Sequence, residues 1–161
     1  MRNFDDTFEN LFLYGDTGVG KTFLSHCIAN ALLESSHCVL YFSAFDLFDS
    51  MAQTAFSRKS ETDPGENFIL DCDLLIIDDL GTELPNSFTV SQLFICLNER
   101  ILRQKSTIIS TNLALDDIKT IYSERTFSRI SSNYTILRIT GDDIRIQKKL
   151  LNLGGTNDVT P

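Results

Sequence analysis

A glycine-rich segment at residues 15–22 constrains the fold of this 161-residue chain more than any other feature. It matches the phosphate-binding loop pattern G-x-x-x-x-G-K-[ST] at every specified position. An apolar run at 11–14 precedes it, and a helix candidate with apolar periodicity at 22–33 follows it. A strand, a glycine turn and a helix in this order direct backbone N–H groups and a helix N-terminus at one polyphosphate. The sequence therefore predicts a nucleoside triphosphate site formed by Gly15, Asp16, Thr17, Gly18, Val19, Gly20, Lys21 and Thr22.

Two side chains of this loop have expected roles of their own. Lys21 would reach the β- and γ-phosphates, and the Thr22 hydroxyl would ligate Mg²⁺. The alternative is a chance match on an ordinary glycine turn. The correct flanks on both sides make that alternative the weaker one.

Adjacent carboxylates at Asp78 and Asp79 follow four large aliphatic residues at 74–77. Such a run suits a strand that is buried on both faces. Because open α/β sheets place their sites at the carboxyl ends of strands, we expect both carboxylates beside the phosphate loop. Asp78 would hold the Mg²⁺ shell through water, and Asp79 would orient an attacking water. A solvated acidic turn is the alternative, which the pairing with Lys21 and Thr22 disfavours.

Asn112 closes the segment Ser110-Thr111-Asn112 at the end of the next predicted strand. Its amide is expected to bond the γ-phosphate or the attacking water, the role called sensor 1. The alternative is a turn residue, since Asn side chains often bond their own backbone.

Arg125 and Arg129 lie four residues apart in a predicted helix, and therefore on one helix face. In an oligomeric ATPase, such a side chain can reach the nucleotide of a neighbouring subunit and stabilise transition-state charge. We assign this role to Arg129 and hold Arg125 in reserve. The alternative is a solvated or salt-bridged surface arginine.

Predicted strands and helices alternate along the chain, which favours an α/β fold with a parallel sheet. We expect one domain over residues 1–150, with a central five-stranded sheet flanked by helices, and a disordered tail over 151–161. A polar loop is expected at 57–67, where Asp63-Pro64-Gly65 is a strong turn signal. The predicted strands are 11–14, 38–43, 74–77, 107–110 and 134–139, and the predicted helices are 22–33, 44–57, 87–105, 114–121 and 123–131.

The amino-acid composition limits the classes of protein to which this chain can belong. Hydrophobic residues make up 42%, which excludes general disorder, and no stretch approaches the length of a membrane span. The four cysteines lack C-x-x-C spacing, so buried reduced thiols in a cytoplasmic protein are expected. A net charge of −8 argues against strong binding of nucleic acid by a single copy of the chain. Any contact with single-stranded DNA should be weak or built by several subunits.

Four segments together resemble the AAA+ domain of DnaC/DnaI-type replicative helicase loaders. They are residues 13–22, LLIIDDLGTE at 74–83, STIISTNL at 106–113, and residues 121–145. The resemblance implies a P-loop NTPase of AAA+ type that self-associates, binds and hydrolyses ATP with Mg²⁺, and has no complete helical lid. It also implies delivery of a hexameric replicative DNA helicase onto single-stranded DNA.

The chain departs from that family pattern in two respects. Loaders usually carry an N-terminal region that contacts the helicase, and only about ten residues precede the first predicted strand here. The chain is then a fragment, a truncated form, or one whose helicase contact lies elsewhere. There is also no room for a full lid after residue 149, so the role of Arg145, which matches a family position, is open.

Three alternative functions stay open at this stage. The nearest is an IstB-type transposition helper ATPase, which shares these motifs and acts with a transposase. The second is a small-molecule kinase, for which no acceptor pocket is evident in the sequence. The third is a non-catalytic module that uses ATP as an assembly switch.

Overall fold

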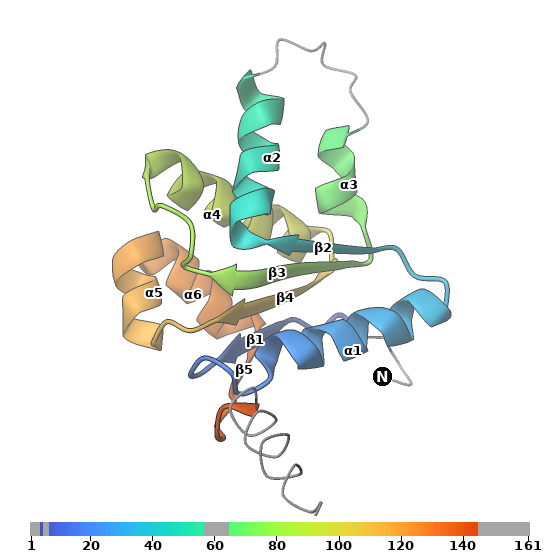
Figure 1. Ribbon diagram of the computed structural model, residues 1–161. Helices are drawn as coiled ribbons and strands as arrows, with labels where there is room; N and C mark the ends of the chain where they lie inside the picture. The colour runs from blue at the N-terminus through green and yellow to red at the C-terminus, as the bar shows by residue number, and fades with distance from the viewer. Residues whose placement is uncertain (1–3, 5–6, 57–64, 145–161) are drawn as a thin grey trace, which may run out of the picture.

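Five parallel strands form one central sheet in the computed structural model, which describes residues 4, 7–56 and 65–144 (Figure 1). The strand order is β2-β3-β4-β1-β5, so the chain crosses over the sheet between neighbours in sequence. This order places β4 between β3 and β1, and the phosphate loop follows β1. The strands are β1 (Leu11–Tyr14), β2 (Val39–Ser43), β3 (Leu74–Leu80), β4 (Ser106–Thr111) and β5 (Thr135–Arg138).

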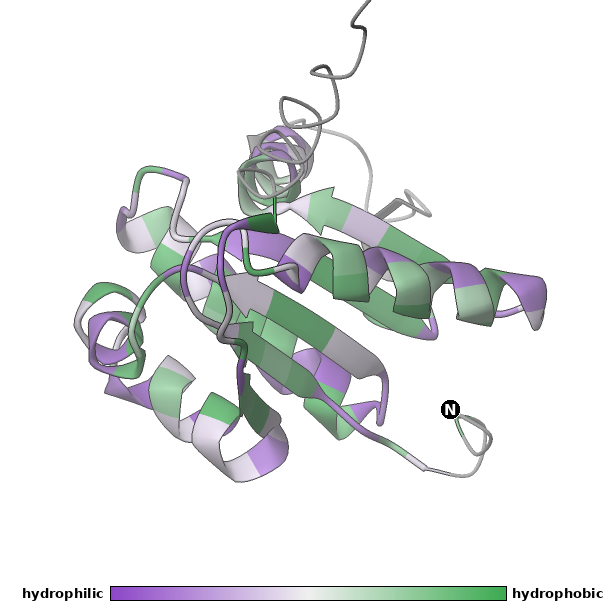
Figure 2. Cartoon of the chain, turned by 60° about the horizontal axis from the view of Figure 1, so that its bottom comes forward, coloured by the Kyte–Doolittle hydropathy of each residue, from purple (hydrophilic) through white to green (hydrophobic). Residues whose placement is uncertain are grey.

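Helices cover both faces of the sheet. One face packs against α1, with Ala29 and Leu32 against Leu74 and Ile76. The other face packs against α2, α4, α5 and α6. Figure 2 shows the strands predominantly hydrophobic between these helices, as expected for a parallel sheet buried on both sides. The helices are α1 (Lys21–Glu34), α2 (Ala44–Phe56), α3 (Gly65–Asp71), α4 (Ser87–Leu102), α5 (Leu115–Tyr122) and α6 (Glu124–Asn133).

All five predicted strands and all five predicted helices are present, with differences at their ends. Strand β3 does not stop before the carboxylates but continues through them to Leu80. Helix α4 ends at Leu102, before the predicted 105, because Gln104 adopts a left-handed backbone with φ 54°. The loop predicted at 57–67 is wrong at its end, since α3 begins at Gly65. The rest of that loop, Arg145 and the 151–161 tail lie outside the described residues.

The cysteine prediction is half right. Cys72 and Cys96 are buried free thiols, but Cys27 and Cys38 are exposed. Cys27 is exposed because α1 turns Ser25, Ala29 and Leu32 toward the sheet and Cys27 to the opposite side.

Arg100 of α4 is fully buried and links three elements at the amino end of β4. Its guanidinium donates to the carbonyl oxygens of Ile69 at 2.6 Å, Ser106 at 2.6 Å and Cys72 at 3.2 Å. It also donates to the Thr107 hydroxyl at 3.0 Å. These bonds give the N–H groups of the buried guanidinium their acceptors, as a buried charge requires.

Replacing Arg100 with alanine is expected to lower the free energy of unfolding by about 3 kcal/mol or more, because several buried acceptors lose their donor. Urea denaturation measures the change. Arg103→Ala is the matched control, since Arg103 pairs with Asp71 at the surface and should cost about 1 kcal/mol or less. Equal losses in the two variants would contradict this assignment.

The helices within residues 4, 7–56 and 65–144 fall short of the length and apolar character that a bilayer crossing requires.

Candidate nucleotide-binding site

The phosphate loop joins the carboxyl end of β1 to the first turn of α1. Gly20 is the N-cap residue of α1 and has a left-handed backbone with φ 100°. No side chain caps the N-terminus of α1, and the first turn of this helix contains no acidic residue. The positive end of the helix dipole is therefore directed at the loop, where a phosphate would gain from it.

Two glycines of the loop have backbone conformations and neighbours that disfavour a larger residue. A Cβ atom on Gly15 would lie 2.1 Å from the carbonyl oxygen of Ile139, and Gly15 has φ 147°. A Cβ on Gly18 would lie 2.2 Å from the Asp143 side chain. The segment after β5 thus packs directly against the loop. At Gly15 the opposing atom is backbone, so only glycine fits, while at Gly18 the left-handed backbone with φ 85° favours glycine.

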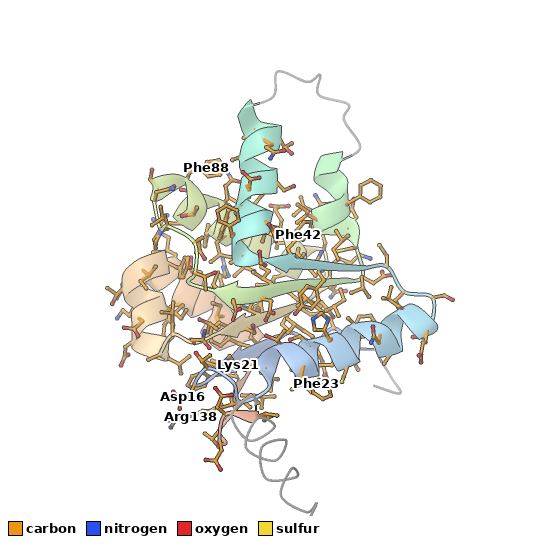
Figure 3. All side chains as sticks on the ribbon, in the orientation of Figure 1. Asp16, Lys21, Phe23, Phe42, Phe88 and Arg138 are labelled. Atoms are coloured by element: carbon orange, nitrogen blue, oxygen red, sulfur yellow. The ribbon has the colours of Figure 1, made fainter. Side chains whose placement is uncertain are left out.

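Lys21 lies inside the loop and is only 5% exposed. Its ammonium group donates to the carbonyl oxygens of Gly15 at 2.8 Å and Asp16 at 2.7 Å, and to Asn112 Oδ1 at 2.7 Å. Figure 3 shows Lys21, Asp16 and Arg138 at the same end of the sheet. Lys21 and Asn112 are 91 positions apart in the sequence, and the sequence predicts that they belong to one site. The structure brings them into contact.

The Asp78 carboxylate is held by hydroxyl groups from three elements. Its Oδ1 accepts from Thr22 of α1 at 3.4 Å and from Ser110 of β4, while its Oδ2 accepts from Tyr41 of β2 at 2.8 Å. The Tyr41 ring also stacks on His26, with ring centroids 4.4 Å apart. Burial and the Asp78 hydrogen bond raise the pKa of the Tyr41 phenol well above its ordinary value, so it stays a donor near neutral pH.

Thr22 and Asp78 supply the kind of oxygen ligands that suit Mg²⁺. This ion is usually bound by one or two protein groups together with substrate phosphates and water. Among the described residues no group of three or more His, Cys, Asp or Glu forms a metal cage. The donor set therefore fits an ion that arrives with a nucleotide.

A cavity of about 490 Å³ opens beside the loop, within the size range of small-molecule sites. Asp79 and Asn112 both line this cavity. Asn112 also lines a neighbouring cavity, together with Asp16. Phe23, His26 and Ile144 line the first cavity as well, and the sequence did not single out these three. Phe23 is 72% exposed and points away from the sheet in Figure 3. The full lining is Thr17, Gly18, Gly20, Lys21, Thr22, Phe23, His26, Asp79, Asn112 and Ile144.

The two candidate arginines lie outside this cavity. Arg125 and Arg129 are exposed on α6, while Phe127 and Ile130 of the same helix pack against the core. The fold of a single chain therefore does not bring Arg129 to the nucleotide site. An arginine that acts on a neighbouring copy would be exposed in this way.

Sequence reasoning missed three groups that support the site. Ser110 and Tyr41 bond Asp78, and Glu83 accepts from the Tyr122 hydroxyl and from the Gly81 N–H at 3.0 Å. Glu83 thereby joins the turn after β3 to α5. The proximity of Ser110 to Asn112 in sequence was a usable signal, but nothing local distinguishes Tyr41 from a core aromatic residue.

The parallel sheet, the phosphate loop and the carboxylates at the end of β3 define a P-loop ATPase of AAA+ type. The chain belongs to the IstB-like ATP binding protein family, whose model matches residues 2–152. Membership confirms the ATP-binding prediction, and this class implies ATPase activity.

Two curated relatives are each 30% identical to the chain. One is the chromosomal replication initiator protein DnaA of Bordetella petrii, matched over 81% of this chain and 27% of its own length. The other is the replicative helicase loader DnaI of Bacillus subtilis, matched over 78% of this chain and 41% of its own length. The chain thus spans between a quarter and a half of these relatives.

A solved structure confirms the predicted fold class. The crystal structure of the DnaC helicase loader superposes with a TM-score of 0.75 at 25% identity. The match covers 85% of this chain and 84% of that one.

Proposed function

We propose that this protein hydrolyses ATP and helps to load the replicative DNA helicase onto single-stranded DNA. The observation that carries the proposal is the structural match to the DnaC helicase loader, which covers most of both chains. The DnaA relative matches over a much smaller share of its own length, so an initiator role has weaker support.

Within the proposed reaction, Lys21 and the loop amides bind the phosphates and hold them in place. Bound Mg²⁺, held by Thr22 and by Asp78 through water, would neutralise phosphate charge. Asp79 and Asn112 orient a water molecule in line with the terminal phosphate. The Lys21 ammonium would exchange its present bonds to the Gly15 and Asp16 carbonyl groups for bonds to the phosphates.

The proposed site is completed by Arg129 of a neighbouring copy, which would stabilise charge on the transferred phosphoryl group. Exposure of Arg129 on α6, outside its own chain's cavity, supports this arrangement. An isolated copy is then a poor ATPase, and self-association activates turnover.

A weak contact with single-stranded DNA is part of the proposal. The net charge of −8 makes a strong electrostatic grip by one copy unfavourable. Several copies arranged along one strand would add their contacts.

The second candidate is a transposition helper of the IstB type, which the family match favours. The two candidates differ in their partner, a hexameric helicase or a transposase, and in their preferred DNA, single-stranded or duplex.

Light scattering of the chain with the host's hexameric replicative helicase tests the proposal. We expect a complex that forms with ATP and weakens with ADP or without nucleotide. Lys21→Ala is the matched control, since it should lose the dependence on nucleotide. Absence of a complex, both for this chain and for any longer product of its gene, would contradict helicase loading. Binding to duplex DNA and to a transposase would then favour the second candidate.

A further inference from the structure

A bulge in β3 explains how two adjacent carboxylates can serve one site. Side chains of consecutive strand residues normally point to opposite faces of a sheet. In β3, Leu74 and Ile76 pack on the α1 face, whereas Leu75 and Ile77 pack on the other. A regular strand would thus turn Asp78 toward α1 and the next residue away from it.

The pairing of β3 with β4 shifts at this point. Ile77 pairs with Ile109 and Leu80 pairs with Thr111, so Asp78 and Asp79 lie opposite the single residue Ser110. Two residues that face one on the partner strand define a β-bulge. As a result Leu80, rather than Asp79, takes the core position that follows Ile77. Asp79 therefore does not follow the alternation of side chains between the two faces of the sheet, and it lines the nucleotide cavity.

The bulge requires an unfavourable backbone at Asp79, which has φ 54°. A residue other than glycine adopts this left-handed conformation only where the surroundings hold it there. The Asp79 N–H donates to the Ser110 hydroxyl oxygen at 3.1 Å. The same Ser110 hydroxyl donates to Asp78 Oδ1.

Ser110 therefore contacts both acidic residues through one oxygen atom. It is fully buried in the central strand β4, so water does not compete for either bond. Tyr41 holds the other oxygen of Asp78 from the opposite side, which leaves the carboxylate little freedom to rotate.

We propose that Ser110 is a positioning residue of the ATPase site. Its hydroxyl stabilises the bulge that turns Asp79 into the cavity, and it orients Asp78 toward Thr22. The inference rests on the proposed roles of Asp78 and Asp79 in the reaction.

Ser110→Ala is the test. ADP affinity without Mg²⁺ is expected to stay within about threefold of the wild type, because the phosphate loop is untouched. The Mg²⁺-dependent gain in ATP affinity and kcat should each fall by about tenfold or more, and KM should rise in step with the lost affinity, as expected when a hydrogen bond to a charged group is lost.

Thr107→Val is the matched control. Thr107 is also fully buried in β4, and its hydroxyl accepts from Arg100 Nε at 3.0 Å at the amino end of the strand, without contacting a carboxylate. We expect it to lose stability as Ser110→Ala does, but to keep kcat and the Mg²⁺ dependence within about threefold of the wild type, since neither Asp78 nor Asp79 loses a bond. If both variants change these quantities equally, or Ser110→Ala changes neither, the positioning role is overturned.

A second variant and a binding measurement test the role of Ser110 even if Ser110→Ala does not fold or the chain does not hydrolyse ATP. Ser110→Cys leaves no cavity and keeps a polar atom that is only a weak donor, so it should behave as Ser110→Ala does, which covers the case of an alanine variant that fails to fold. The Mg²⁺ dependence of ATP affinity does not require turnover. A wild-type chain without ATPase activity would therefore contradict the proposed function alone, while this binding measurement still decides the role of Ser110.

Discussion

Lys21→Ala is expected to abolish measurable nucleotide binding. The Lys21 ammonium is buried in the loop and would form charge-assisted hydrogen bonds to the β- and γ-phosphates. Each such bond contributes about 1.5–3 kcal/mol, so ADP and ATP affinity should fall by about 100-fold or more. Isothermal titration calorimetry with each nucleotide measures the change.

Lys105→Ala is the control for this variant. Lys105 pairs with Asp73 at 2.9 Å and lies at the amino end of β4, at the opposite end of the sheet from the phosphate loop. It removes the same charge from the chain but should leave affinity unchanged. Thermal denaturation should accompany both measurements, because Lys21 also bonds the Gly15 and Asp16 carbonyl groups. Affinity retained by a folded Lys21→Ala protein would disprove the site.

Arg129→Ala is expected to leave ATP and ADP affinity intact and to remove turnover. An arginine supplied by a neighbouring subunit accelerates phosphoryl transfer by about 10³-fold or more in GTPase systems, and we expect a loss of that order or somewhat smaller here. Steady-state ATP hydrolysis, at a concentration where the wild-type chain self-associates, measures the loss. Normal turnover in Arg129→Ala would refute the assignment.

A mixing experiment separates action on a neighbour from a local effect. Lys21→Ala retains Arg129, and Arg129→Ala retains an intact nucleotide site. Their mixture should therefore recover part of the activity at interfaces that combine one of each. No recovery would argue against action between subunits. Arg125→Ala discriminates between the two candidate arginines. Arg125 is exposed on the same helix, and its variant should keep most of the activity if Arg129 is the residue that acts.

Much of the fold could be predicted because its signals are local. Continuous apolar runs marked β1 and β3, and turn residues separated strands from helices. The prediction failed at the start of helix α3. Residues 65–67 were predicted as loop because Asp63-Pro64-Gly65 suggests a turn, yet the helix begins at Gly65 itself.

Part of the candidate site could be predicted in the same way. The phosphate loop is a run of consecutive residues whose function depends on its own backbone. Asn112 and the two carboxylates could be placed because strand ends of a parallel sheet meet at one edge. Arg129 could be identified as a candidate only, since its proposed target belongs to another copy of the chain.

The amino-acid sequence alone was enough to establish the nucleotide loop, the parallel α/β architecture and the acidic residues at the end of β3. Each depends on short segments whose conformation or burial is set by neighbouring residues. Tertiary structure alone showed how Asp79 reaches the nucleotide side next to Asp78, because the bulge opposite Ser110 depends on the register between β3 and β4. It also decided that Tyr41 holds Asp78. Both features arise from residues more than 30 positions apart, which only strand pairing brings together.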